Sequence, residues 1–315
     1  MRDILTVTLN PALDLATEVG IVEANQKLRC DAPVTDPGGG GINVSRAIQL
    51  LGGTSRTFVA LGGRNGDRIE ELLETAGLTV IRHEAPGETR SSLAVLSKSS
   101  GDQYRFMLPG PNWFPLDATA VEAAVVEAAS PGGLVVLSGS LPPGMPAQIM
   151  PDLCARLAEK GADVIADTSG PALHLFAHGE TARPLVLRMN HFEASELAGH
   201  MLADLKESAD FASELLDRGV AQMVIVARGP EGSILATREG RWHSHAADVP
   251  IRSKVGAGDT FVGTFTLSLA EGLPLPAALT RAVAAASAAV MTEGTLLCRP
   301  EDARRLIDHC PAGPI

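Results

Sequence analysis

The sequence of 315 residues predicts an α/β protein in which a mainly parallel sheet is covered by helices on both faces. Continuous apolar runs at 134–137, 163–166, 185–187 and 223–226 have the composition of strands that are buried on both sides. Segments of helix length and mixed polarity separate these runs. Small or polar residues follow each run, as in Ser138-Gly139-Ser140, and open α/β sheets bind their ligands at such strand ends.

The N-terminal third predicts further strands and a helix that follows a glycine run. Residues 4–9 are β-branched and apolar and stop at Asn10-Pro11, so we predict a strand there. Alternating segments at 92–96 and 103–108 predict a hairpin. The run 38–41 precedes apolar residues with helical spacing, a pattern that disfavours a flexible linker. It is neither a Walker A loop nor a GxGxxG fingerprint.

A second glycine turn, Gly256-Ala257-Gly258, ends in Asp259 and leads into a helix-compatible run through Leu269. The first amides of a helix have no intrahelical partner, and the helix dipole adds positive charge, so such a turn suits a phosphate. An acid in this position is explained if it acts on the group that receives the phosphate. We therefore predict a phosphoryl-transfer site in which Asp259 is the base. Residues 277–292 and 300–309 are predicted to form the closing helices.

Charge and cysteine usage limit the classes of partner. The chain has 26 basic and 37 acidic residues and a net charge of −11, which argues against broad contact with nucleic acid or an anionic membrane. Its four cysteines form no CxxC pair, which argues against a zinc site or a disulfide framework. The sequence begins without an apolar signal segment, so we expect a cytoplasmic protein.

Three motifs in order resemble the PfkB branch of the ribokinase-like sugar kinases, over nearly the whole chain: Gly38-Gly39-Gly40-Gly41-Ile42-Asn43, Asn190-x-x-Glu193 and Gly256-Ala257-Gly258-Asp259. Within this branch the chain is most similar to the minor, PfkB-type 6-phosphofructokinases. The resemblance implies one kinase domain over 1–315, folded as a three-layer sandwich. It also implies a small β-sheet lid, with strands from about 13–33 and 90–108, through which two subunits pair as a homodimer.

The resemblance implies transfer of the γ-phosphoryl group of ATP to fructose 6-phosphate, giving fructose 1,6-bisphosphate and ADP. Asp259 would be the general base, and Gly256, Ala257 and Gly258 would form the anion hole. The expected ligands of the sugar and its phosphate are Asp14, Lys27, Arg29, Gly39, Asn43, Arg90, Ser92, Arg105 and Ser140.

For the nucleotide, the resemblance implies contacts from Arg188, Asn190, Ala227, Gly229, Gly232 and Ser287. It also implies Mg²⁺ held by Glu193 through water, and a K⁺ site formed by Ser253, Val255, Ala289, Thr292 and Gly294. Several positions depart from the family pattern, among them Phe192, where a polar residue is frequent, and Leu296, where Arg is frequent. Arg188-Met189-Asn190 stands where Lys-Pro-Asn is usual, and Ala227 stands where a Ser or Thr usually precedes the Gly-x-x-Gly loop.

Other functions remain open at the level of sequence. A relative that phosphorylates fructose 1-phosphate or tagatose 6-phosphate would share these motifs, although the former often carries a Lys within the glycine run. A non-catalytic sugar-phosphate sensor would not need Asp259. A dinucleotide-dependent oxidoreductase would need GxGxxG after the first strand, and the sequence has none there.

Overall fold

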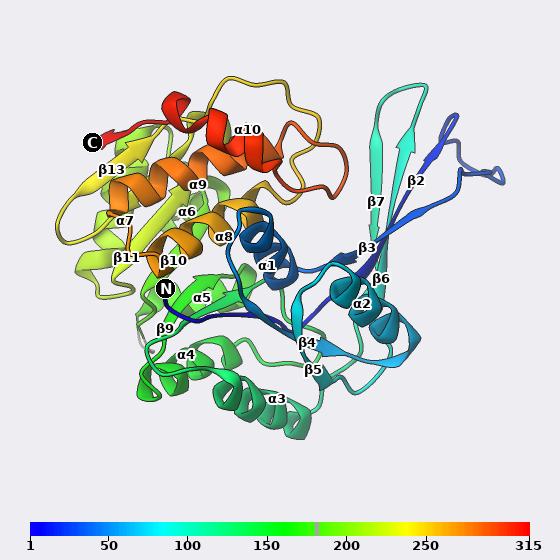
Figure 1. Ribbon diagram of the computed structural model, residues 1–315, viewed down its shortest axis with the longest axis horizontal. Helices are drawn as coiled ribbons and strands as arrows, with labels where there is room; N and C mark the ends of the chain where they lie inside the picture. Colours follow the sequence, from blue (N-terminus) through cyan, green and yellow to red (C-terminus); the bar gives the residue numbers. More distant parts are fainter. Residues whose placement is uncertain (180–182) are drawn as a thin grey trace.

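The computed structural model describes residues 1–179 and 183–315, and within these ranges the chain forms one large sheet, one small sheet and helices on both faces of the large sheet (Figure 1). The strands are β1 (Ile4–Thr8), β2 (Ala12–Val19), β3 (Val34–Gly38), β4 (Arg56–Leu61), β5 (Thr79–Glu84), β6 (Arg90–Ser97), β7 (Gln103–Met107), β8 (Leu134–Ser138), β9 (Asp163–Asp167), β10 (Val186–Asn190), β11 (Met223–Ala227), β12 (Ser233–Ala236), β13 (Arg241–Ser244) and β14 (Ala312–Pro314). The helices are α1 (Gly40–Leu50), α2 (Gly63–Thr75), α3 (Pro115–Ala128), α4 (Ile149–Glu159), α5 (Gly170–His178), α6 (His191–Ala198), α7 (Leu205–Asp217), α8 (Ala257–Ala270), α9 (Leu275–Ala289) and α10 (Pro300–Arg305), with the 3₁₀ turns η1 (Gly229–Glu231) and η2 (Ile307–His309).

The large sheet has the strand order β14-β13-β12-β11-β10-β9-β8-β1-β4-β5 in the described part of the chain. From β5 to β11 all neighbouring strands are parallel. The strands β12, β13 and β14 extend this sheet in antiparallel fashion. The predicted mainly parallel sheet is therefore confirmed, and the antiparallel extension at one edge is a feature that the sequence did not predict.

Two apolar layers cover the large sheet, and alternate residues of each strand point into opposite layers. In β8, Val135 and Leu137 belong to the core beneath α3 to α7. Leu134 and Val136 belong to the core beneath α1, α8, α9 and α10. All four side chains are essentially inaccessible to solvent. The double-sided burial explains why these strands appear in the sequence as unbroken apolar runs.

The small sheet has the order β3-β2-β6-β7 and projects from one side of the body (Figure 1). Its central strands β2 and β6 are parallel, and each outer strand pairs in antiparallel fashion. The antiparallel partner of β2 is β3 (Val34–Gly38), which lies just after the expected segment 13–33. The first glycine of the run, Gly38, therefore belongs to this strand, and only the later glycines lead into α1.

No helix in the two described ranges has the length and apolar character needed to cross a membrane.

Candidate active site

The proposed base lies at the beginning of α8, where the sequence placed an anion-binding turn. The helix starts after Gly256, which serves as N-cap without a side-chain capping bond, and Asp259 lies in the first turn. The first backbone hydrogen bond of the helix joins the amide of Thr260 to the carbonyl of Gly256. The amides of Ala257 and Gly258 precede this bond and are therefore available to an external acceptor.

Asp259 is an unusually basic carboxylate. Burial raises its pKa, and the negative charge of Asp167 raises it further, to about 6. Three groups oppose this rise: the Nδ2 amide of Asn43, which donates to Oδ2 of Asp259 at 2.8 Å, and the cations of Arg188 and Arg46. A carboxylate with a pKa near 6 is mostly ionised at neutral pH, and it accepts a proton more readily than an ordinary aspartate.

Arg188 places a cation beside the amides of α8. It extends from β10, and its Nη1 donates to Oδ1 of Asp167 at 3.0 Å. Its buried Nε has no hydrogen-bond partner among the described residues. The guanidinium lies next to Gly258, so an anion bound at the start of α8 would meet both the free amides and this cation.

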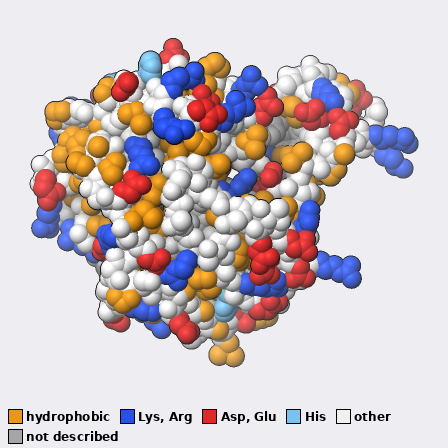
Figure 2. Space-filling model, in the orientation of Figure 1, with side chains coloured by type: hydrophobic (Ala, Val, Ile, Leu, Met, Phe, Trp, Pro, Cys, Tyr) orange, Lys and Arg blue, Asp and Glu red, His pale blue; other side chains and the backbone are white. Residues whose placement is uncertain are grey.

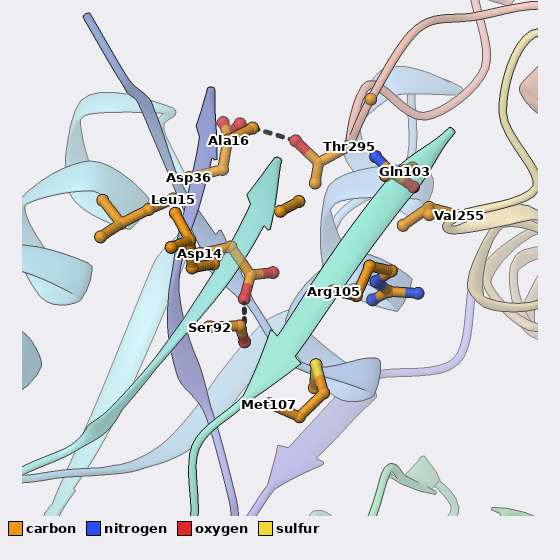
Figure 3. Close-up of a pocket in the computed structure, with 13 residues that line it drawn as sticks. Asp14, Leu15, Ala16, Asp36, Ser92, Gln103, Arg105, Met107, Val255 and Thr295 are labelled. Atoms are coloured by element: carbon orange, nitrogen blue, oxygen red, sulfur yellow. Dashed lines mark hydrogen bonds between the residues drawn. The ribbon is translucent and has the colours of Figure 1, made fainter. Parts of the chain in front are cut away.

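A pocket opens beside this centre, between the small sheet and the loop that follows α9. Asp14, Ser92 and Arg105 line it from the small sheet, and Val255 and Gly294 line it from the body (Figure 3). Figure 2 shows the surface hollowed between the projecting small sheet and the body. The hydroxyl of Ser92 donates to Oδ1 of Asp14 at 2.8 Å. Burial raises the pKa of Asp14, so this carboxylate lies in a poorly solvated position.

Arg90 is the first residue of β6, two residues before Ser92, and it is not among the residues that line the pocket. Its guanidinium makes long bonds of 3.3–3.4 Å to the backbone carbonyls of Asn10 and Leu108. Nδ2 of Asn10 in turn donates to the hydroxyl of the exposed Ser140 at 3.2 Å. Weak neutral contacts leave the guanidinium of Arg90 able to exchange these carbonyls for a phosphate.

Of the other predicted sugar ligands, two lie close to the proposed base and two lie in an exposed segment of the chain. Gly39 is the N-cap of α1, and its carbonyl accepts the amide of Asn43, so both residues lie close to Asp259. Lys27 and Arg29 lie in the exposed segment between β2 and β3. Neither residue is among the side chains that line the described pocket.

The Asn190-x-x-Glu193 motif forms a capping box at the start of α6. The side-chain oxygen of Asn190 accepts the amides of Phe192 and Glu193, while Oε2 of Glu193 accepts the amide of Asn190 at 2.8 Å. This reciprocal cap explains the spacing of the motif by itself. It leaves Nδ2 of Asn190 and Oε1 of Glu193 for other contacts. Burial raises the pKa of Glu193, and a bound cation would offset that cost.

The predicted nucleotide residues converge from adjacent strands. Asn190 and Ala227 are paired in register at the ends of β10 and β11. Gly229 faces open space, whereas a Cβ at Gly232 would overlap the carbonyl oxygen of Ser244. Position 232 therefore has to be glycine, because the backbone of β13 lies against it. The hydroxyl of Ser287 accepts the amide of Ala247 at 3.2 Å and anchors the loop before α8 to α9.

The five residues of the expected K⁺ site lie in the loop before α8 and at the end of α9 with the loop that follows it, and a hydrogen bond joins the two loops. The hydroxyl of Ser253 donates to the carbonyl of Gly294 at 3.0 Å. The hydroxyl of Thr292 donates to the carbonyl of Ala289 at 2.8 Å. Val255 and Gly294 also border the same pocket. Uncharged oxygens fit a monovalent cation, and no group of three or more His, Cys, Asp or Glu side chains suited to a metal occurs within the described ranges.

The structure adds four residues that the sequence analysis did not assign to the site. Asp167 ends β9 next to Arg188. Asp36, Arg46 and Thr295 connect the small sheet to Asn43. One signal was present in the sequence: Asp36 and Arg46 flank the glycine run, and Arg46 follows Asn43 by three residues, which places both on one face of α1.

Comparison with known proteins gives consistent results. A family model described as pfkB family carbohydrate kinase matches residues 7–302. The chain is 38% identical over 307 residues to ATP-dependent 6-phosphofructokinase isozyme 2 of Escherichia coli, with 97% of this chain and 98% of that protein covered. The protein of the same name from Mycobacterium tuberculosis is 37% identical over 308 residues, with 97% and 89% covered.

Solved structures agree with these relatives. Phosphofructokinase-2 of E. coli in complex with potassium has a TM-score of 0.93 at 37% identity, and its complex with fructose 6-phosphate has a TM-score of 0.91 at 36% identity; both cover 98% of this chain and 99% of that chain. Ribokinase of Thermotoga maritima matches with a TM-score of 0.76 at 21% identity, covering 98% of this chain and 100% of that chain. The predicted ribokinase-like fold is confirmed.

Proposed function

We propose that this chain, which belongs to the pfkB family of carbohydrate kinases, transfers the γ-phosphoryl group of ATP to fructose 6-phosphate, giving fructose 1,6-bisphosphate and ADP. The observation that carries the proposal is the position of Asp259. A buried carboxylate with a pKa of about 6 lies beside free helix amides and the cation of Arg188. A sensor protein has no use for such a base.

In the proposed reaction Asp259 accepts the proton of the sugar hydroxyl while that oxygen bonds to the γ-phosphorus of ATP. The bond between this phosphorus and the β–γ bridging oxygen breaks, and ADP leaves. The amides of Gly256, Ala257 and Gly258 and the cation of Arg188 stabilise the charge on the transferring phosphoryl group.

The acceptor is held by groups that line the pocket, such as Asp14, and by groups outside its lining. Asp14, Gly39, Asn43 and Ser140 supply contacts to its hydroxyl groups. Arg90 binds its phosphate, because the guanidinium fork exchanges two weak carbonyl contacts for charged ones. Ser92, Arg105, Lys27 and Arg29 complete the cationic and polar surroundings of this phosphate.

The nucleotide lies along the ends of β10 and β11. Asn190, Ala227, Gly229, Gly232 and Ser287 contact it, and Arg188 extends toward its terminal phosphate. Mg²⁺, when bound, neutralises charge on the ATP phosphates, and the free Oε1 of Glu193 suits a contact through water. The chelator EDTA is expected to abolish turnover, and added Mg²⁺ is expected to restore it.

We also infer a K⁺ site from the oxygens of Ser253, Val255, Ala289, Thr292 and Gly294. Its support is the convergence of the two loops, together with the potassium complex of the E. coli relative. The two substrates are cytoplasmic metabolites, which supports the expected cytoplasmic location.

The small sheet acts as a lid and as the surface through which two subunits pair. Its outer strand β7 exposes the large apolar side chains of Tyr104 and Phe106, which alternate along the strand with the pocket-lining Gln103, Arg105 and Met107 and so point to the opposite face. An apolar surface of this kind favours a protein partner. Sedimentation of the wild-type chain and of a Phe106→Asp variant tests the inference: a monomeric wild type contradicts it.

An assay of ADP release with fructose 6-phosphate, fructose 1-phosphate and tagatose 6-phosphate tests the proposed function. We expect the highest kcat/KM with fructose 6-phosphate. Preference for fructose 1-phosphate would instead make the chain a 1-phosphofructokinase. Binding of a phosphosugar without any ADP release would support the sensor and reject the kinase.

A further inference from the structure

A continuous line of polar side chains connects the small sheet and the loop after α9 to Asp259. The hydroxyl of Thr295 donates to Oδ2 of Asp36 at 2.6 Å, across the gap between loop and sheet (Figure 3). Oδ1 of Asp36 lies 3.9 Å from Nη2 of Arg46. Nη1 of Arg46 donates to Oδ1 of Asn43 at 3.3 Å, and Asn43 donates to Asp259.

Arg46 and Asp259 together determine which end of the Asn43 amide faces the base. A guanidinium has hydrogen-bond donors and no acceptor, so only the oxygen of the amide can face Arg46. The NH₂ end then faces the Asp259 carboxylate, where it donates at 2.8 Å. The ionised carboxylate of Asp259 only accepts hydrogen bonds and favours the same orientation, so the loss of Arg46 would leave the amide with one of its two orienting contacts.

Asp36 gives the buried cation its nearest carboxylate partner. The side chains of Arg46 and Asp36 are 17% and 23% exposed, so their charges are poorly solvated and attract each other more strongly than a surface pair does. Asp36 is itself part of β3, in register with Asp14 of β2. The position of the small sheet therefore determines where this carboxylate stands relative to Arg46.

We propose that Asp36 and Arg46 are positioning residues, which align the Asn43 amide on the base when the small sheet contacts Thr295. The proposal rests on the kinase function inferred above and adds a role to residues that the phosphoryl-transfer scheme does not use. It makes the orientation of the base depend on the sheet that covers the acceptor. Catalysis is then favoured in the conformation in which the sheet contacts the loop.

A double-mutant cycle tests the connection between Thr295 and Asp36. Thr295→Val removes one hydroxyl with little change in shape, and Asp36→Ala removes its partner. We expect each variant to lower kcat about three- to tenfold, the scale of one hydrogen bond, with the KM for ATP unchanged. The double variant should be no slower than the slower single variant.

The matched control is Thr237→Val. Its hydroxyl also donates to a carboxylate, Oε2 of Glu239 at 2.8 Å, but in the turn between β12 and β13. This variant should keep the wild-type kcat. Effects of Thr295→Val and Asp36→Ala that multiply independently, or an unchanged kcat, would overturn the proposal.

Arg46 is tested by Arg46→Met and Arg46→Lys through the pH dependence of kcat/KM. Asp259 is faced by Asp167 from β9, Arg188 from β10, and Asn43 and Arg46 from α1. Arg46→Met removes a cation that lowers the pKa of Asp259 and takes away one contact of the amide. The acid limb, where activity falls as Asp259 becomes protonated, should therefore move to higher pH. Arg46→Lys keeps the charge and should restore part of the shift. The control Arg82→Met removes an arginine that pairs with Asp67, Glu70 and Glu84, and it should leave the limb in place.

The outcomes separate this proposal from the proposed function. A wild-type chain without phosphotransfer to any phosphosugar rejects the function. An active wild type whose Arg46→Met variant loses stability but keeps its acid limb rejects the positioning role alone. If Arg46→Met does not fold, the near-isosteric variant Thr295→Val tests the positioning role instead. An unchanged kcat in Thr295→Val is sufficient to reject the proposal.

Discussion

The guanidinium of Arg188 lies against Gly258, so that a Cβ added to this glycine would stand 3.1 Å from Nη2 of the arginine. The helix that carries the base therefore touches the cation that faces the same anion. The absence of a side chain at position 258 is what allows this approach. Gly258 thus has a function that its place in a helix does not explain, because alanine is the better helix former.

Gly258→Ala should lower kcat about three- to tenfold, because the added Cβ pushes the guanidinium of Arg188 a few tenths of an ångström away from the phosphoryl group. Its melting temperature should stay the same or rise, since alanine suits the first turn of a helix. Steady-state kinetics and thermal unfolding check both statements. Gly313→Ala in β14, where an added Cβ meets nothing within 4 Å, is the control and should keep full activity. A Gly258→Ala variant with normal kcat would show that the close approach has no catalytic role.

Asp259→Asn should lower kcat by roughly 10²–10⁴, the scale of a lost general base. It should also stabilise the protein at pH 8. The folded-state pKa of about 6 lies above the ordinary value of 3.8, so ionisation of Asp259 destabilises the fold. This cost is absent below pH 4, grows between pH 4 and 6 and is complete above pH 6. Denaturant unfolding should show a gain of about 1–3 kcal/mol at pH 8 and none at pH 4.

Asp167→Asn should move the acid limb of kcat/KM to lower pH. The charge of Asp167 raises the pKa of Asp259, and its removal also frees Arg188 from its ion pair. Both changes favour the ionised base. The control Asp163→Asn lies at the other end of β9, where its carboxylate pairs with Arg2. A limb that moves upward in Asp167→Asn would contradict the assignment of the limb to Asp259.

Arg90→Ala should raise the KM for the phosphosugar far more than the KM for ATP, by at least tenfold for the loss of a charged hydrogen-bonding fork. The control is Arg68→Ala on α2, which removes an exposed arginine that forms a salt bridge with Glu71. This variant should change neither the KM for the phosphosugar nor the KM for ATP. Equal increases in both KM values for Arg90→Ala would place this residue outside the acceptor site.

Local patterns predicted the parts of the molecule that local chemistry determines. The buried strands β8 to β11 appear as apolar runs because both of their faces are covered. The turn before α8 is visible because its two glycines and the acid that follows them together form a pattern suited to binding a phosphate at a helix start. The strands β12 to β14 are only three or four residues long, and even the fully buried β12 is too short a run for its sequence alone to distinguish a strand from a loop.

Contacts between distant parts of the chain could not be predicted in this way. Thr295 and Asp36 are separated by 259 residues, and each has an ordinary local environment in the sequence. The Asn190-x-x-Glu193 motif shows a related difficulty. Its residues serve a helix cap in the structure, so its spacing alone does not distinguish a cap from a metal contact.

The bond between Asn43 and Asp259 spans 216 residues, which has a consequence for the synthesis of the protein. At the usual 5–20 residues per second, about 10–40 s pass between the emergence of the first residue and that of the second. During this interval the earlier strands and the glycine run can already fold. The base arrives only with α8, so a partly made chain cannot consume ATP.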